Sequence, residues 1–353
     1  MHLGFGFYRH MLKPEYYRFA QQCGCTHAIV HLCDYGLSRK AKGDDQPIDE
    51  EEGWGVANHP GLWTLDELLK IKAELAEYGL EFYAIENFDP AQWHDVLLDG
   101  PKKEQQMEQL KEQIRIVGEA GVSVFGYNFS IAGVAARDKV KTRGGAPAVG
   151  MVKGNTLKDK PIPNGMVWNM VYDPDAPEGV LESISHGELW SRLEYFLRNI
   201  LPVAEEAGVI MAAHPDDPPL ESVRCQPRLV YQHALYQKLL DLVKSPSNQL
   251  EFCVGTLAEM EDGDLYACVE RYANQNVLPY VHLRNVRGTV PEYVETFIDD
   301  GKIDVGLVLR ILKENDFQGV VIPDHAPQME CSAPWHAGMA FALGYIKAKM
   351  EEA

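Results

Sequence analysis

The sequence has no excess of basic residues. Its 33 lysines and arginines stand against 52 aspartates and glutamates, giving a formal net charge of −19, and no run rich in lysine or arginine interrupts this acidic background. Such a charge repels phosphate groups, so we expect neither nucleic acid nor an anionic membrane surface as a partner. The hydrophobic content of 46% is typical of a packed globular protein and excludes general disorder.

Long hydrophobic runs are also missing. No stretch approaches the roughly 20 apolar residues that cross a bilayer, and residues 1–5 lack the features of a signal peptide. We therefore expect a cytoplasmic protein. The seven cysteines are odd in number, and the only close pair, Cys23-Gly24-Cys25, has the wrong spacing for a CxxC motif. In a reducing compartment they are expected as free thiols or metal ligands.

A GxGxxG motif is absent after the first predicted strand, which disfavours the alternative of a doubly wound open sheet. Instead, short apolar runs alternate with segments whose apolar residues recur every three or four positions. The predicted strands are 3–8, 27–33, 80–86, 122–128, 208–214, 250–254, 279–285 and 319–324. The predicted helices are 14–24, 64–78, 103–120, 187–207, 228–244, 261–275, 304–315 and 335–350. This alternation predicts an α/β fold, a (β/α)8 TIM barrel that spans residues 1–353 as a single domain.

Two long segments do not fit the minimal βα unit. Residues at about 34–63 and 129–186 are polar, rich in Gly, Pro and Asp, and follow predicted strands. In a barrel they are βα-loop insertions over the C-terminal face. They act as lids, or they only decorate the rim or form subunit contacts, and the sequence leaves these alternatives open.

Polar side chains stand at the ends of most predicted strands. They are Glu86, Asn128, His214, Cys253, His282 and the pair Asp324-His325. The carboxyl ends of barrel strands converge on one pocket, where barrel enzymes place their chemistry. Any one of these residues by itself is explained as a hydrogen-bonded polar residue of the core. Their occurrence at the ends of successive strands, however, predicts a shared site.

Four of these residues offer two imidazoles, one thiolate and one carboxylate. They are His214, Cys253, His282 and Asp324. This is a plausible ligand set for a divalent transition metal, and its softness favours zinc, iron, cobalt or manganese over magnesium.

Two neighbouring features point to the surroundings of that metal. Period-two alternation puts Arg284 on the same strand face as His282, where its planar guanidinium suits a substrate carboxylate. After His214, either Asp216 or Asp217 orients the imidazole ring, or these carboxylates only cap the chain as it turns.

Several motifs resemble those of the mannonate dehydratase family, which belongs to the xylose-isomerase-like barrels. The main matching segments are HPDDPP at 214–219, FCVGT at 252–256, HLRNV at 282–286 and PDH at 323–325. Further matches are GYNF at 126–129, LPVAEEAG at 201–208 and DFQG at 316–319. The resemblance covers most of the chain and is strongest from 185 to 325.

The resemblance implies a hydro-lyase that removes water from D-mannonate to give 2-keto-3-deoxy-D-gluconate. It implies a divalent metal, foremost Mn²⁺ with Fe²⁺, Co²⁺ or Zn²⁺ as alternatives, held by the four ligands named above. It also implies that His325 is the catalytic acid/base. Removing a proton next to a carboxylate builds negative charge there, which a bound cation together with Arg284 stabilises.

The chain departs from the family pattern at three places. The family usually has Arg-Pro-Asp-His-Gly at the eighth strand, whereas this chain has Ile322-Pro-Asp-His-Ala. In Gly6-Phe-Tyr-Arg9 the basic residue of the first strand is shifted. The tyrosine-rich stretch that supplies a second catalytic residue is replaced by residues 332–339, where His336 is the candidate substitute.

These departures leave the exact substrate open. The alternative within enzymes is a metal-dependent sugar isomerase or epimerase of the xylose-isomerase-like group. A non-catalytic sugar-acid binder is the alternative outside enzymes, and the retained ligand set and His325 argue against it. The oligomeric state, including a homo-oligomer, is also left open.

Overall fold

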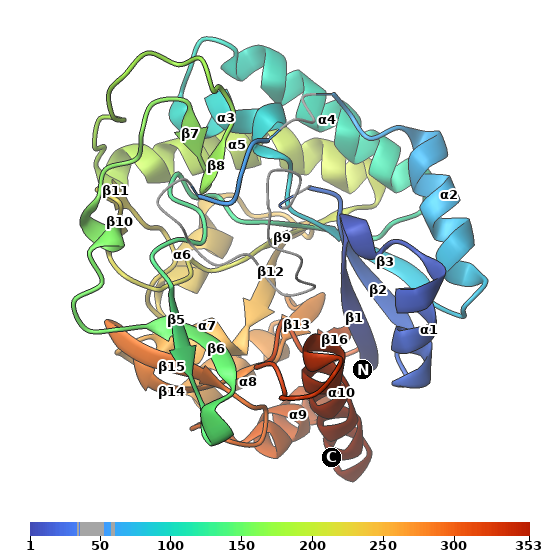
Figure 1. The fold of residues 1–353 in the computed structure, drawn as a ribbon. Helices are drawn as coiled ribbons and strands as arrows, with labels where there is room; N and C mark the ends of the chain where they lie inside the picture. Colours follow the sequence, from blue (N-terminus) through green and yellow to red (C-terminus); the bar gives the residue numbers. More distant parts are fainter. Residues whose placement is uncertain (34, 36–52, 58–60) are drawn as a thin grey trace.

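A closed barrel of eight parallel strands forms the centre of the computed structural model, which describes residues 1–33, 35, 53–57 and 61–353 (Figure 1). The barrel strands are β1 (His2–Tyr8), β2 (His27–His31), β3 (Glu81–Glu86), β4 (Val124–Tyr127), β9 (Ile210–Ala213), β12 (Asn248–Cys253), β13 (Tyr280–His282) and β16 (Val320–Ile322). They pair in the order β1-β16-β13-β12-β9-β4-β3-β2. The predicted TIM barrel is therefore confirmed.

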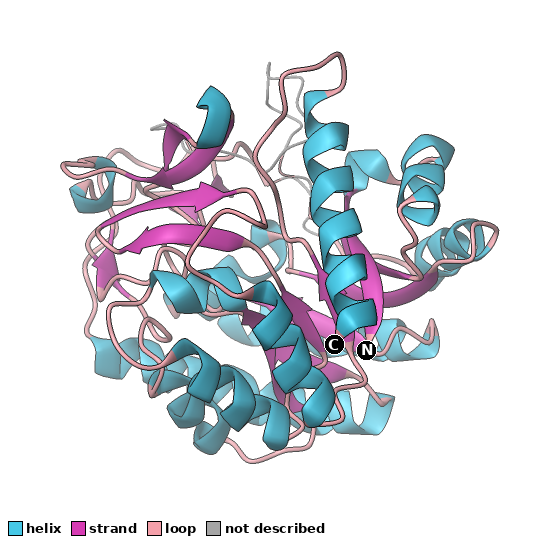
Figure 2. Ribbon diagram, turned by 90° about the horizontal axis from the view of Figure 1, so that it is seen from below, coloured by secondary structure: helices cyan, strands magenta, loops and turns pink. Residues whose placement is uncertain are grey.

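Helices lie around the barrel strands (Figure 2). Those predicted from the sequence are α1 (Pro14–Gln22), α2 (Leu65–Ala76), α4 (Lys103–Glu119), α5 (His186–Ala207), α6 (Leu235–Leu242), α8 (Leu265–Asn274), α9 (Val305–Glu314) and α10 (Pro334–Glu352). Local signals set their ends. A capping box of Ser185 and Glu188 begins α5, and Gly208, with a φ of 69°, ends it in a left-handed conformation.

Helix α6 begins later than predicted, and two short helices were not predicted. The amides of Leu229 and Val230 donate to the carboxylate of Asp216, so this segment turns on Asp216 and the helix begins only at residue 235. The missed helices are α3 (Pro90–Leu98) and α7 (Val254–Glu259). Both follow directly after strand ends, where a short helix leaves little periodic signal.

The strands are buried on both faces, which explains why they read as nearly continuous apolar runs. A small cluster fills the barrel interior with side chains from several strands, namely Ile29, Ala84, Val124, Ala212, Tyr280, Val320 and Ile322. A second, much larger cluster joins the outer strand faces to the helices. Among the described residues, no helix is both long and apolar enough to cross a membrane.

Long βα loops build a second layer over the carboxyl ends of the strands. The segment 129–186 contains β5 (Asp138–Lys141), β6 (Pro147–Met151), β7 (Met166–Val167) and β8 (Met170–Val171). Strands β5 and β6 join a hairpin that was not predicted, β14 (Asn285–Thr289) and β15 (Glu292–Thr296), in a four-stranded sheet of order β14-β15-β6-β5. Most of the other predicted insertion, 34–63, lies outside the described residues.

Smaller elements complete the chain. A two-stranded pair, β10 (Ser222–Val223) and β11 (Gln226–Pro227), follows β9. Short 3-10 helices are η1 (Arg9–Met11), η2 (Arg143–Gly145) and η3 (Leu157–Asp159).

Candidate metal centre

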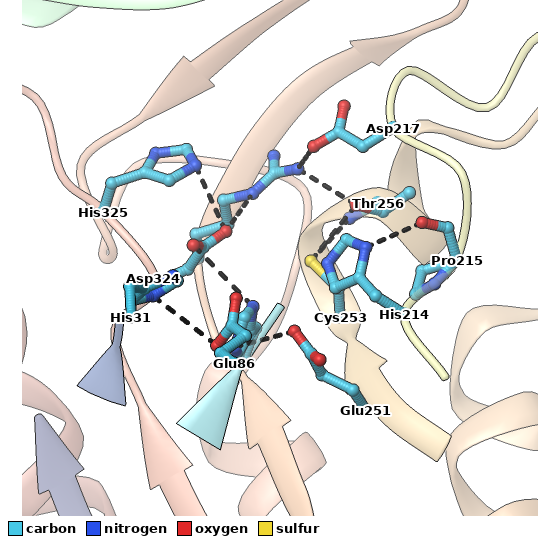
Figure 3. Close-up of polar contacts among 12 residues, drawn as sticks. His31, Glu86, His214, Pro215, Asp217, Glu251, Cys253, Thr256, Asp324 and His325 are labelled. Carbon is cyan, nitrogen blue, oxygen red and sulfur yellow. Dashed lines mark hydrogen bonds and ion pairs between the residues drawn. The ribbon is translucent and has the colours of Figure 1, made fainter. Parts of the chain in front are cut away.

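Three of the predicted ligands converge at the carboxyl ends of neighbouring strands. The candidate ligand atoms of His214, Cys253 and His282 all lie within 4.8 Å of one another. Parallel pairing of β12 with β13 places Cys253 directly opposite His282. Asp324, two residues past the end of β16, has its Oδ1 atom 3.7 Å from Nδ1 of His282. The barrel thus brings all four predicted ligands to one place, and Figure 3 shows three of them, His214, Cys253 and Asp324.

The donor atoms of this cluster suit a cation. Nδ1 of His214 lies 2.7 Å from the carbonyl oxygen of Pro215, which holds the ring so that its other nitrogen faces the cluster. Both ring nitrogens of His282 are buried and have no hydrogen-bond partner among the described residues. Unsatisfied buried nitrogens are costly, and a metal ion would satisfy one of the two.

The surroundings of Cys253 favour its thiolate. Its sulfur accepts hydrogen bonds from the amide of Thr256 at 3.4 Å and from the Thr256 hydroxyl at 3.1 Å. Burial alone would raise the pKa of Cys253, but the Arg284 guanidinium and the neighbouring imidazoles of His214 and His282 outweigh it and lower the pKa to about 5. The deprotonated form is the one that binds metals.

Two buried glutamates stand behind His282. Its Nε2 atom lies 3.4 Å from Glu86 and 3.4 Å from Glu251. Burial and the neighbouring charge of Glu86 raise the pKa of Glu251 well above its usual value. For the carboxyl group of Glu86, the neighbouring His31 and His282 outweigh the effect of burial and lower the pKa to about 2. The pair therefore places one negative charge behind the imidazole.

Sequence reasoning singled out Glu86 but missed Glu251. Glu251 lies two residues before Cys253 on β12, so period-two alternation puts both on the same strand face. That signal was present in the sequence. Glu251 stands near the start of the predicted strand 250–254 and not near its carboxyl end, where the predicted site residues lie.

His325 is held between two carboxylates. Its Nδ1 lies 2.8 Å from Glu295 and its Nε2 lies 3.1 Å from Asp324. Burial alone would lower the pKa of His325, but Asp324 and Glu295 raise it to about 10, so the ring is an imidazolium at neutral pH. Glu295 lies on β15, in the hairpin that the sequence did not predict, and no local pattern marked it.

Arg284 differs from the expectation. Its guanidinium donates to Glu259, to Asp217 at 2.9 Å and to Asp324 at 3.1 Å, and its side chain is only 2% exposed. Thr256 accepts a further hydrogen bond. Because protein groups take up the donors on every side, this arrangement argues against Arg284 as the receptor of a substrate carboxylate and for a role in positioning the carboxylates around it.

The two aspartates after His214 have different partners. Asp216 accepts from the amides of Leu229 and Val230 at 2.7 and 2.9 Å, so it fastens a loop and does not orient the His214 ring. Asp217 pairs with Arg284 and borders the cavity. Of the two alternatives, the turn-capping interpretation describes Asp216.

His336 also differs from the expectation. It lies on α10, where its ring stacks on Tyr16 of α1 at a centroid distance of 5.6 Å and meets Phe19 edge-on at 5.0 Å. It is absent from the residues that line the cavity beside the ligands. Packing between α1 and α10 therefore holds His336 on the outer layer, which argues against a catalytic role.

A cavity opens beside the ligand cluster. The candidate ligands His214, His282 and Asp324 line it together with His325. Aromatic rings form much of the remaining wall, namely Tyr8, Tyr35, Trp54 and Trp168. The cavity wall therefore has polar groups at the side of the ligand cluster and aromatic faces around the rest, as ligand pockets commonly do.

Comparison with known proteins gives a consistent picture. The family model for D-mannonate dehydratase (UxuA) matches residues 48–346. The mannonate dehydratase of Streptococcus pneumoniae (strain 70585) is 32% identical over 312 residues, covering 82% of this chain and 84% of that protein. That of Geobacillus thermodenitrificans (strain NG80-2) is 31% identical over 306 residues, covering 81% and 82%.

Solved structures agree. The mannonate dehydratase from Streptococcus suis serotype2 superimposes with a TM-score of 0.76 at 26% identity, covering 100% of this chain and 94% of the other. An L-ribulose 3-epimerase superimposes with a TM-score of 0.57 at 13% identity, covering 99% and 95%, and this likeness shows the fold alone.

Proposed function

This chain belongs to the mannonate dehydratase family of hydro-lyases, and on that premise we propose that it removes water from D-mannonate and releases 2-keto-3-deoxy-D-gluconate. The observation that carries the proposal is the convergence of His214, Cys253 and His282 within 4.8 Å beside the Asp324-His325 pair. Dehydration is favoured over epimerisation because the epimerase likeness rests on 13% identity.

The metal of this enzyme is a divalent ion, foremost Mn²⁺, held by His214, Cys253, His282 and Asp324. The unsatisfied nitrogens of His282 and the thiolate form of Cys253 support this assignment. When bound, such an ion polarises substrate oxygens and stabilises the negative charge that builds when the proton next to the carboxylate is removed. Fe²⁺, Co²⁺ and Zn²⁺ are alternatives, because thiolate and imidazole ligands suit them as well.

His325 donates the proton that the departing hydroxyl group needs. Its position between Asp324 and Glu295 supports this role, because both carboxylates hold the ring in place and keep it protonated. Hydroxide is a poor leaving group. A positioned acid that protonates the departing hydroxyl group typically accelerates such a step by roughly 10²- to 10⁴-fold.

His31 is the candidate base for the proton next to the carboxylate. It lines the cavity at the end of β2, and its Nε2 lies 3.6 Å from Glu86. Burial lowers the pKa of His31 and outweighs the neighbouring charge of Glu86, so its imidazole is neutral at pH 7. A neutral imidazole accepts a proton, and the carboxylate of Glu86 then stabilises the cation that forms.

The test is turnover of D-mannonate by the Mn²⁺-loaded protein in D₂O, followed by NMR. We expect a keto-deoxy acid, and we expect His325→Asn to lower kcat by about two to four orders of magnitude with unchanged metal content. Recovery of epimerised, deuterated sugar acid without any keto-deoxy product would instead establish an epimerase. Protein stripped by a chelator serves as the control for uncatalysed reaction.

A further inference from the structure

A sugar acid carries a carboxylate, and beside the proposed metal centre a side-chain cation is expected to bind it, yet three expected positions do not supply one. The donors of Arg284 point at Glu259, Asp217 and Asp324. The family's arginine at the eighth strand is replaced by Ile322, which packs into the apolar barrel interior. A carboxylate is an expensive group to bury without a hydrogen-bonded cation.

The shifted basic residue of the first strand is also engaged elsewhere. Arg9 donates to the backbone carbonyl of Leu32 at 3.0 Å and to the carboxylate of Glu67, at the start of α2, at 2.6 Å. It is not among the residues that line the cavity. The first strand therefore offers no cation to a ligand there.

One arginine does line the cavity. Arg137 comes from the loop segment after β4, is only 3% exposed, and lies with its guanidinium carbon 5.9 Å from the centre of the Trp54 ring. Among the described residues of the cavity wall it is the sole arginine, and no lysine accompanies it. The histidines of that wall lie around the ligand cluster and its carboxylates.

The backbone before Arg137 is built to hold it there. Ala136 adopts a left-handed conformation with a φ of 66°, which non-glycine residues rarely adopt. The side-chain amide of the buried Asn155 donates to the carbonyl oxygen of Ala136 at 3.1 Å and to the carboxylate of Asp138 at 2.8 Å. Hydrogen bonds on both sides of Arg137 thus fasten the turn that carries it.

We propose that Arg137 receives the carboxylate group of the substrate and thereby selects sugar acids over neutral sugars. The inference rests on the proposed function for the identity of the acid. The planar guanidinium binds a carboxylate through two parallel hydrogen bonds, a geometry that a lysine ammonium does not reproduce. The loop insertion, and not the barrel, then determines the substrate class.

The experiment compares D-mannonate with D-mannitol, a neutral polyol of the same chain length and configuration. Binding is titrated by calorimetry on the Mn²⁺-loaded His325→Asn protein, so that turnover does not consume the acid. Into this parent we introduce Arg137→Met, Arg137→Lys or, as the matched control, Arg143→Met. Arg143 lies in the same insertion, but it is exposed and pairs with Asp299 at 2.8 Å.

In the parent we expect D-mannonate to bind more tightly than D-mannitol. Arg137→Met should weaken D-mannonate binding by about 10- to 100-fold, the loss expected for one charge-assisted pair, and leave D-mannitol binding within about twofold. Arg137→Lys should lose less, because the charge remains. Arg143→Met should change neither ligand. Unchanged D-mannitol binding also reports that the variant cavity is intact.

Two results would overturn the inference: equal weakening of both ligands, or a parent that binds the acid no more tightly than the polyol. Turnover by the wild-type protein is scored separately. An Arg137-dependent preference for the acid without any keto-deoxy product would refute the proposed function and leave this inference standing. Dehydration of D-mannonate with an unchanged KM in Arg137→Lys and Arg137→Met would support the proposed function and refute the inference about Arg137.

Discussion

Replacing the sulfur of Cys253 by oxygen separates metal binding from folding. Serine is close to cysteine in volume, and its hydroxyl can keep the hydrogen bonds from the amide and hydroxyl of Thr256. The barrel should therefore fold. The substitution nevertheless removes a negative charge and a soft donor from the candidate metal centre.

The size of the effect follows from the pKa of Cys253, which is about 5. At pH 7 the thiolate outnumbers the thiol by roughly 100 to 1, whereas an ordinary cysteine is mostly protonated. Relative to an ordinary thiol with a pKa of about 8.5, this preformed thiolate spares a deprotonation cost of roughly 30-fold in apparent affinity at pH 7. A serine hydroxyl stays protonated and lacks the soft donor, so we expect Cys253→Ser to weaken metal binding by at least about 30-fold.

Calorimetric titration with Mn²⁺ and with Zn²⁺ measures this loss, and thermal unfolding of the metal-free protein reports the fold. The matched control is Cys268→Ser, because Cys268 is also buried but lies on α8, and burial raises its pKa to about 12. That variant should lose some stability and no metal affinity. If Cys253→Ser bound both ions as tightly as the wild type, the proposed ligand set would be wrong.

Three further outcomes test the surrounding groups. His31→Asn should lower kcat on D-mannonate by about 10²- to 10⁴-fold with metal content unchanged, and full activity would exclude His31 as the base. Arg284→Met should lower the free energy of unfolding by about 3 to 5 kcal/mol in urea, because it leaves buried carboxylates unpaired; a change confined to KM would contradict this positioning role. Burial would lower the pKa of His214, but Glu251 and Cys253 raise it to about 9 in the metal-free protein. The metal must therefore displace a proton, and apparent Mn²⁺ affinity should rise with pH up to about 9, with proton release visible in buffer-dependent heats; an affinity that is flat from pH 7 to 9 would contradict this.

The barrel and its candidate ligands were accessible from the sequence because they depend on local patterns. Alternation of apolar runs with helical periodicity identified every barrel strand. The ligand candidates follow from their positions at strand ends, since parallel strands must bring those ends together. Glu251 was also accessible, because it shares a strand face with Cys253.

Other features depend on contacts between segments that are distant in the chain. Arg284 reads as a substrate-binding residue in its own strand, yet its partner Asp217 lies 67 positions away and takes up its charge. Glu295 reaches His325 only because an unpredicted hairpin pairs with the 129–186 insertion. No residue spacing encodes such a pairing.

The sequence by itself determined the barrel, the strand ends and the residue types available for metal chemistry, because burial and periodicity act over a few residues. Only the tertiary structure decided which charged groups are already paired and which face the cavity. Carboxylates surround Arg284, which is not among the residues of the cavity wall, and Arg137 is one of the residues that line this wall. The physical reason is that electrostatic pairing depends on distances between side chains, and packing of the long loops sets those distances.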